Sequence, residues 1–188
     1  MKRPSHDPRR FDVAAAAADA AMLEGQWPLH GFARLADGRP AGLADEGQVH
    51  WSVRAQLRPV SGGAAQVWLH LAARAQVWRE CQRCLAPVAL DLEVARPLRF
   101  VASEALAAEL DAECEDDVLA LSQRLDLHQL VEDELLLALP LVPMHETCPQ
   151  ALPVAASDVA PGPQAITAPR PFAALAQLKR RRGPGGGP

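Results

Sequence analysis

The sequence predicts an α+β fold: an antiparallel β-sheet, a meander of three to five strands, packed by one long apolar helix between flexible N- and C-terminal tails. Apolar and polar residues alternate strictly through residues 49–57 and 67–77, and again from residue 88. A leucine-rich stretch with helical spacing follows at 127–139. A chain of 188 residues is long enough for one domain of this kind without disulfides.

The first element is an N-terminal arm or helix over residues 1–25. Arg9 and Arg10 precede an alanine run, an arrangement that superficially resembles an export signal. Asp12 and Asp19 interrupt that run, and no strongly apolar stretch follows it. We therefore expect a cytoplasmic protein, and no segment of the chain approaches the length of a membrane span.

An α+β domain is predicted over residues 26–148. Its first two strands join through turn chemistry at Pro59 to Gly63, and the third strand resumes past Pro97 to Val101. A cysteine knuckle lies at the tip between the second and third strands. The first strand is the clearest, because its apolar face is continuous: Val49, Trp51, Val53, Ala55 and Leu57.

Two helices follow the strands. Ser103 is placed to cap a short helix that ends near Glu113. Asp126 and Gln129 resemble a capping box, which predicts a second helix from about Leu127. The leucines at 135–137 and 139 widen its apolar stripe until little polar surface remains, so we expect this helix to be buried against the sheet until Pro140 ends it.

Beyond the domain, residues 149–171 form a Pro/Ala-rich linker, and residues 172–188 form a short helix-prone tail with a basic cluster. The tail changes the charge balance of the chain. Residues 1–158 carry 14 basic and 23 acidic residues, a formal charge of −9. Such a body repels bare phosphate, so the charge predicts protein partners or contact through the tail. The basic cluster of the tail is Lys179, Arg180, Arg181 and Arg182.

Cysteine spacing indicates the candidate site. Cys81 and Cys84 are a knuckle apart, and His145 and Cys148 follow far downstream at i, i+3. Thiolates and imidazole suit tetrahedral zinc, so the four residues are a candidate Cys₃His structural site. Two alternatives stay open: a pair of small buried thiols at a strand turn, and a thioredoxin-type redox pair, which normally needs a helix N-terminus.

The run Cys81-Gln82-Arg83-Cys84-Leu85, joined to the segment from Leu130 to Cys148, resembles the YceD family, the large ribosomal RNA subunit accumulation proteins of bacteria and plastids. The resemblance covers roughly residues 27–148 and a short piece near the end. Family members often carry two further cysteines where this chain has His145 and Cys148. The resemblance implies a factor that supports synthesis, processing or stability of 23S ribosomal RNA and large-subunit assembly, with a ribosomal protein, an assembly factor or 23S rRNA precursor as partner.

The remaining candidates concern binding. Arg83 is a candidate partner or phosphate contact, with a solvated knuckle residue as the alternative. Glu132, Asp133 and Glu134 point about 100° apart on a helix and cannot converge on one reacting atom, so a partner-facing edge is predicted. The chain shows no Ser/His/Asp set, phosphate loop or suitably placed carboxylate pair. We therefore expect no enzyme, no small-molecule substrate and no membrane partner; the alternative functions are a CxxC thiol oxidoreductase and a metal-free protein interaction module.

Overall fold

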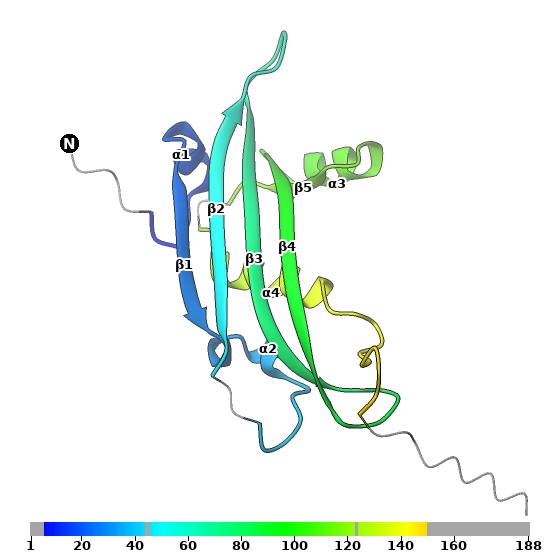
Figure 1. The fold of residues 1–188 in the computed structure, drawn as a ribbon. Helices are drawn as coiled ribbons and strands as arrows, with labels where there is room; N and C mark the ends of the chain where they lie inside the picture. The colour runs from blue at the N-terminus through cyan, green and yellow to red at the C-terminus, as the bar shows by residue number, and fades with distance from the viewer. Residues whose placement is uncertain (1–5, 44–45, 123, 150–188) are drawn as a thin grey trace, which may run out of the picture. The chain divides into compact units, whose positions relative to one another are not determined.

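The structure, a computed structural model, describes residues 6–43, 46–122 and 124–149. Five strands form one sheet: β1 (Met22–Pro28), β2 (Gln48–Arg58), β3 (Gln66–Glu80), β4 (Pro87–Val101) and β5 (Asp117–Ala120). They lie in chain order across the sheet (Figure 1), and β1 to β4 are antiparallel. The predicted α+β class and antiparallel meander are confirmed. The addition is β5, which pairs parallel to β4.

The alternation seen in the sequence sets the register of the sheet. Trp51 of β2 pairs with Ala73 of β3, and Ala73 pairs with Val94 of β4, so one row of apolar side chains crosses three strands on the buried face. Pro97 interrupts no pairing with β5, because β5 pairs with β4 only from Leu98 onward. The strand can therefore run through Pro97 without a break.

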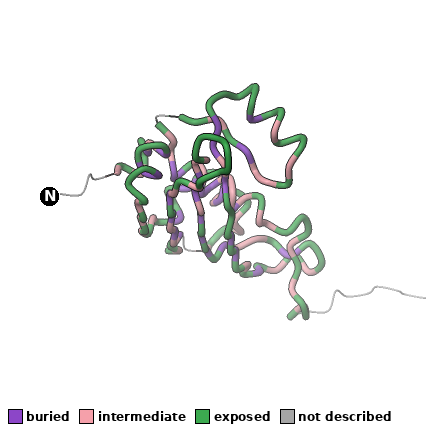
Figure 2. Tube along the Cα trace, turned by 90° about the horizontal axis from the view of Figure 1, so that it is seen from above, coloured by how far each residue is buried: buried purple, intermediate pink, exposed green. Residues whose placement is uncertain are grey.

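One face of the sheet is covered by α1 (Val13–Ala18), the 3₁₀ turn η1 (Leu29–Gly31), α2 (Ala33–Ala36) and α4 (Leu127–Leu137). Figure 2 shows buried stretches of the chain enclosed by exposed ones. The segment predicted as an arm or helix contains α1 and the first part of β1. Phe11 and Val13 are fully buried in the same core as the sheet, and the backbone of Phe11 pairs with that of Leu125.

Helix α4 begins where its cap predicts, because the carboxylate of Asp126 accepts hydrogen bonds from the N–H groups of His128 and Gln129. It differs from the long, wholly apolar helix predicted. It has 11 residues, buries Glu132 beside Leu135, and leaves Leu137 73% exposed. Leu136 and Leu139 still pack against the core, whereas Leu137 faces solvent, so α4 is amphipathic.

Helix α3 (Glu104–Glu113) packs at the β4–β5 edge of the sheet (Figure 1). Ser103 caps it as predicted, since its hydroxyl accepts from the N–H of Leu106 at 3.3 Å. Ala107 of this helix packs against Val101 and Val118, a cluster separate from the main core. Within the described ranges, no helix combines the length and apolar character that crossing a bilayer requires. The predicted linker beyond Pro149 and the predicted basic tail lie outside the described residues.

Candidate metal centre

The first half of the site is the tight turn that joins β3 to β4. The N–H of Cys81 donates to the carbonyl of Ala86 at 2.9 Å, and the N–H of Leu85 donates to the carbonyl of Cys81 at 2.8 Å. Leu85 adopts a positive φ of 60°, which closes the turn and leaves its side chain 64% exposed. This geometry places the Cys81 and Cys84 thiols on one side of the knuckle, as the spacing predicts.

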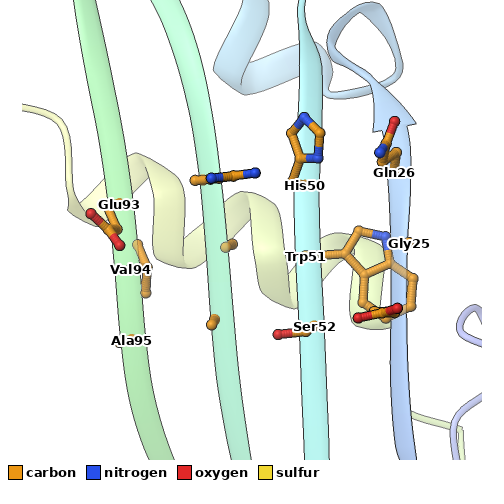
Figure 3. A pocket seen from close by; sticks show the side chains of 12 residues that line it. Gly25, Gln26, His50, Trp51, Ser52, Glu93, Val94 and Ala95 are labelled. Atoms are coloured by element: carbon orange, nitrogen blue, oxygen red, sulfur yellow. The ribbon is translucent and has the colours of Figure 1, made fainter.

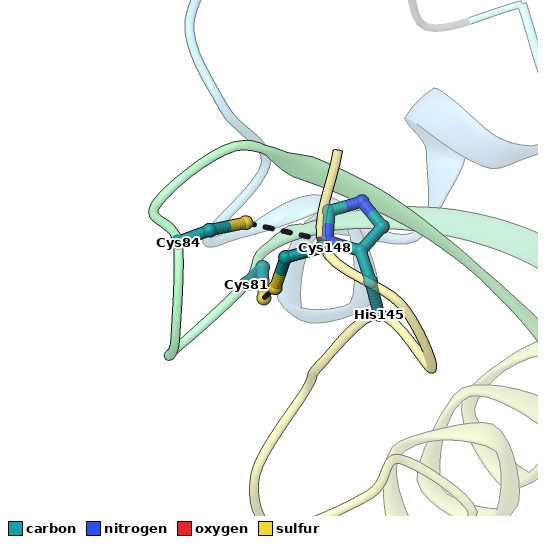
Figure 4. A group of neighbouring side chains, drawn as sticks. All are labelled: Cys81, Cys84, His145 and Cys148. Atoms are coloured by element: carbon teal, nitrogen blue, oxygen red, sulfur yellow. Dashed lines mark hydrogen bonds between the residues drawn. The ribbon is translucent and has the colours of Figure 1, made fainter. Parts of the chain in front are cut away.

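The second half is the segment after α4, and three backbone acceptors fasten it to the knuckle. The N–H of Gln82 donates to the carbonyl of Pro143 at 2.9 Å. The Nη2 group of Arg83 donates to the carbonyls of His145 at 2.7 Å and Glu146 at 3.2 Å. Figure 4 shows the result: the segment after α4 lies beside the β3–β4 turn and presents a histidine and a cysteine to it.

The four candidate ligand atoms lie within 4.8 Å of one another. The sulfurs of Cys81 and Cys148 are 3.9 Å apart, and the sulfur of Cys84 is 3.5 Å from Nδ1 of His145. A tetrahedral zinc ion with ordinary bond lengths needs ligand separations of about 3.8 Å between two sulfurs and about 3.5 Å between sulfur and nitrogen. The Cys81–Cys148 and Cys84–His145 separations match these values, so the donor set suits zinc in chemistry and in these two distances.

Outer contacts orient the histidine for this role. Its Nε2 lies 3.1 Å from the carbonyl of Pro87, so Nε2 carries the proton and donates, which leaves Nδ1 free as the ligand atom toward Cys84. Metal-binding histidines usually have such a carbonyl or carboxylate partner on the other ring nitrogen, because it fixes the tautomer and the ring orientation.

The thiols are electrostatically unequal. Burial alone would raise the pKa of Cys81, but N–H groups of His145, Cys84 and Arg83 and the His145 side chain outweigh it and lower the pKa to about 5. For Cys84, an N–H of Ala86 lowers the pKa, while burial and the neighbouring thiols of Cys148 and Cys81 raise it overall. Three thiols this close resist multiple ionisation unless a cation joins them.

Arg83 is the cation already present. Its Nε donates to the sulfur of Cys148 at 3.0 Å, and that contact raises the pKa of the guanidinium. Together with its two carbonyl contacts, this hydrogen bond fixes the position of Cys148. A Cys₃His zinc site carries one net negative charge, which the guanidinium offsets. The sequence suggested a partner contact for Arg83, and its donors in the structure face the site.

The predicted acidic edge lies elsewhere, on α4. The Glu132 carboxylate is buried and accepts hydrogen bonds from the N–H groups of Arg34 and Leu35 and from the Arg34 guanidinium. Asp133 also pairs with Arg34, at 2.6 Å, and Glu134 lies 3.4 Å from Nε of Arg96. These carboxylates connect α4 to α2 and β4 and do not reach the cysteines. The basic cluster Lys179 to Arg182 is outside the described residues.

Sequence reasoning missed a set of exposed apolar side chains in the knuckle, at the end of α4 and in the segment between α4 and Cys148. Leu141 is fully exposed and Leu137 is 73% exposed, close in sequence to the ligand pair. The signal was present: Pro140 and Pro143 bracket a short apolar stretch that follows the predicted helix and has no strand or helix to bury it. We name as the apolar strip Leu85, Leu137, Leu141, Val142 and Met144.

Three comparisons with known proteins bear on this site. The family model described as "Large ribosomal RNA subunit accumulation protein YceD" matches residues 69–179, a stretch that includes the whole candidate metal centre. A Haemophilus influenzae protein with the same description is 40% identical over 104 residues, which cover 54% of this chain and 59% of that relative. The alignment thus spans less than two thirds of the relative's length. No solved structure matches. On the extent of the family match, this chain belongs to the YceD family of large ribosomal RNA subunit accumulation proteins.

Proposed function

We propose that this protein is a non-enzymatic binding factor that supports the synthesis, processing or stability of 23S ribosomal RNA and thereby assembly of the large ribosomal subunit. One observation supports this most: the two separated sequence segments that identify the family meet in a single closed site. That site has the character of a structural clasp, because its side chains face one another and leave no reacting position.

Zinc is the metal proposed for the clasp. The ligand atoms of Cys81, Cys84, His145 and Cys148 support it through their separations and their chemistry. Bound there, zinc would join the β3–β4 turn to the segment after α4 and would supply folding free energy. With four protein ligands it would have no open coordination position for a substrate or an activated water.

The binding role rests on what surrounds the clasp. The apolar strip exposes Leu137 and Leu141, which flank Pro140 between α4 and the ligand pair, and grouped exposed apolar side chains are typical of interaction surfaces. A ribosomal protein or an assembly factor would bury such a strip on binding. The 23S rRNA precursor would be bound either through that protein partner or by this chain directly. This proposal implies action in the cytoplasm, where ribosomes assemble.

A thiol oxidoreductase has weaker support. The low pKa of Cys81 suits a redox thiolate as well as a metal ligand, but the Cys81 side chain is fully buried. The CxxC turn also joins two antiparallel strands and does not lead into a helix. Metal analysis of untagged protein is expected to find one zinc per chain. If the purified protein contains no metal and Cys81 and Cys84 oxidise reversibly, the redox function is favoured. If it contains no metal and the thiols show no redox cycling, the metal-free interaction module is favoured.

The functional test is a deletion strain profiled for ribosomal RNA and subunits. We expect reduced 23S relative to 16S RNA, restored by the wild-type chain and not by Cys148→Ser. Cys114→Ser is the matched control, because Cys114 lies outside the site and donates to the carbonyl of Leu110 in α3. Normal 23S levels and normal subunit profiles in the deletion strain would refute the proposed function.

A further inference from the structure

The face of the sheet opposite α1 and α4 is open over much of its area. Figure 3 looks onto this face: His50, Ser52 and Glu93 project from the strands toward the viewer, and α4 runs behind them. Only the β4–β5 edge of the face carries a helix among the described residues, where α3 covers Val101. The open face is therefore a large surface of mostly polar side chains, with no partner inside the described domain.

Charge on this face is segregated. Toward the knuckle, the outward positions of β3 and β4 include Glu80, Asp91 and Glu93. Toward the β2–β3 turn, the outward positions of β2, β3 and β4 contain no acidic residue. The outward residues of that half are Ser52, Arg54, Gln56 and Arg58 on β2, Gln66, Trp68, His70 and Ala72 on β3, and Ala95, Pro97, Arg99 and Val101 on β4.

We name as the basic patch Arg54, Arg58, Trp68, His70 and Arg99. The Arg58 guanidinium stacks 4.0 Å from the centre of the Trp68 ring. Arg58 also donates to Nε2 of His70 at 2.9 Å; because arginine has no acceptor, this nitrogen must accept and the imidazole is neutral. Burial, then Arg58 and Arg54, lowers the pKa of His70, which agrees with a neutral ring in a positive field.

Two arginines of the patch have unused donors. Arg54 is exposed and makes no hydrogen bond or ion pair with the described part of the chain. The Nε of Arg99 is buried and likewise has no hydrogen-bond partner there. The exposed guanidinium of Arg54 is therefore open to an external acceptor, whereas the Nε of Arg99 is enclosed and adds only positive charge to the patch.

Shape adds to charge. A depression of about 310 Å³ lies directly beside Arg54 and His70, and small side chains form its floor. Ser52, Ala72 and Ala95 occupy neighbouring outward positions on three strands, which creates the hollow, and Arg54 and His70 stand at its rim. The hollow has room for a base or a ribose next to the cationic groups.

We propose that the basic patch binds single-stranded RNA, with Arg54 and Arg58 on backbone phosphates and a base on the outer face of the Arg58 guanidinium, which lies over the buried Trp68 ring. This deepens the proposed function, since it assumes that the RNA bound is the large-subunit species. An acidic peptide would satisfy the arginines alone; the stacked guanidinium and the adjoining hollow are features that suit nucleotides.

The same surface limits the path of the strand. Helix α3 borders the patch on the β4 side and carries Glu104, Glu109 and Glu113 without a basic residue. Phosphates are repelled there, so the RNA crosses β2 and β3. The overall acidity of the protein does not prevent this contact, because charges farther away than the Debye length, about 8 Å at physiological salt, are largely screened and the charges of the patch itself dominate.

The test measures fluorescence anisotropy of a labelled single-stranded RNA with the full chain over a series of salt concentrations. The Arg54→Glu/Arg58→Glu variant is expected to bind about 10- to 100-fold more weakly. The slope of log affinity against log salt should fall by about 1.4, since each single-strand phosphate contact contributes about 0.7. Arg10→Glu/Arg124→Glu makes the same charge change on exposed residues away from the open face and should stay within about twofold of wild type.

The single variant Arg54→Glu controls for loss of binding through misfolding, because this exposed side chain makes no contact that supports the fold. It should still weaken RNA binding. Unchanged affinity in the patch variants, equal losses in the control variant, absence of RNA binding by the wild type, or stronger binding of polyglutamate than of RNA would each overturn the proposal. Those results would not contradict the proposed function in 23S rRNA accumulation. Conversely, normal 23S RNA in a deletion strain would contradict that function but would not change the measured RNA affinity.

Discussion

Arg83 holds together the two halves of the candidate metal centre. It donates to the sulfur of Cys148 and to the carbonyls of His145 and Glu146, so one side chain fixes both the position of a ligand and the segment that carries it. Removing such an outer contact typically weakens metal affinity by 10- to 100-fold. We expect Arg83→Ala to bind zinc about 10- to 100-fold more weakly, measured by competition with a chromophoric chelator.

Arg83→Lys tests the geometry, because it keeps the charge and loses the planar fork. It should recover only part of the affinity. Arg74→Ala is the matched control, since Arg74 is an exposed arginine on the open face of β3 and touches neither segment. Zinc affinity of Arg83→Ala equal to wild type would show that the guanidinium does not support the clasp.

Glu132 stabilises the fold in a pH-dependent way. Burial would raise the pKa of its carboxyl, but hydrogen bonds from the Arg34 side chain and from the N–H groups of Leu35 and Arg34 outweigh burial and lower it. A carboxyl whose pKa is lower in the folded state stabilises the fold at pH values above its unfolded-state pKa of about 4.3. That stabilisation disappears as the pH falls through its folded-state pKa. We expect Glu132→Gln to lower the free energy of unfolding by about 2–3 kcal/mol at neutral pH.

Urea unfolding at pH 7 and at about pH 3 measures the difference in the free energy of unfolding between wild type and Glu132→Gln. This difference should be smaller at about pH 3 than at pH 7. Asp133→Asn is the control, because Asp133 pairs with the same arginine while 43% of its side chain is exposed. Its cost should stay below about 1 kcal/mol at either pH. A Glu132→Gln deficit that persists undiminished at acid pH would contradict the assignment.

The sequence brought out the four candidate ligands, which the structure places together, but not the role of Glu132. Ligand residues are recognisable because metal chemistry restricts them to a few side-chain types at short spacings, here twice within four residues. The partner of Glu132 is Arg34, which lies 98 residues away and has no pattern that marks it. Ion pairs between distant segments depend on the tertiary fold, which periodicity does not encode.

At the level of elements, the clasp connects α4 to the sheet through the segment after Leu137. We expect removal of zinc to release this segment while β2, β3 and β4 keep their pairing. Limited proteolysis after chelation should then cut between Leu137 and Cys148, and circular dichroism should show little loss of strand content. Protection returning on addition of zinc is the control. Equal cleavage with and without metal would mean that the segment is held by its hydrogen bonds alone.

Strand β1 shows why one element escaped prediction. It contains Gly25 and ends at Pro28, both unusual in strands, and its alternation is short. The structure explains the glycine: a Cβ at Gly25 would lie 2.9 Å from the Trp51 ring, which stacks on Trp27 at 4.4 Å. The residue that weakens the strand signal is required by packing against the neighbouring strand, a contact visible only in the fold.

At the level of the whole molecule, the N-terminal segment belongs to the core. Phe11 is fully buried and pairs through its backbone with Leu125, just before α4. We expect Phe11→Ala to lower the free energy of unfolding by about 3–5 kcal/mol, the usual cost of removing a buried aromatic ring. Met22→Ala is the control, since Met22 is 59% exposed, and should change stability by less than about 1 kcal/mol. Denaturant unfolding followed by tryptophan fluorescence measures both.

The fold class and the central strands could be predicted because alternation over β2, β3 and β4 is long and regular. The parallel strand β5 could not, because four residues carry too little pattern. For α4, the start was predicted correctly, but the helix was expected to be longer and more completely buried than it is. Composition alone does not show which side chains of a helix face the core and which face solvent. Local signals thus define elements, and packing decides their extent.

The candidate ligands are synthesised at two separate times, because they lie far apart in the chain. During synthesis the first thiol pair emerges together with the meander, whereas the histidine and the last cysteine emerge only after α4. The missing candidate ligands lie in the segment that follows the helix closing the hydrophobic core. If the proposed zinc site is correct, its four ligands are complete only after α4 has been made, and zinc-starved cells should accumulate chains whose sheet is formed but whose last segment is not held to the β3–β4 turn.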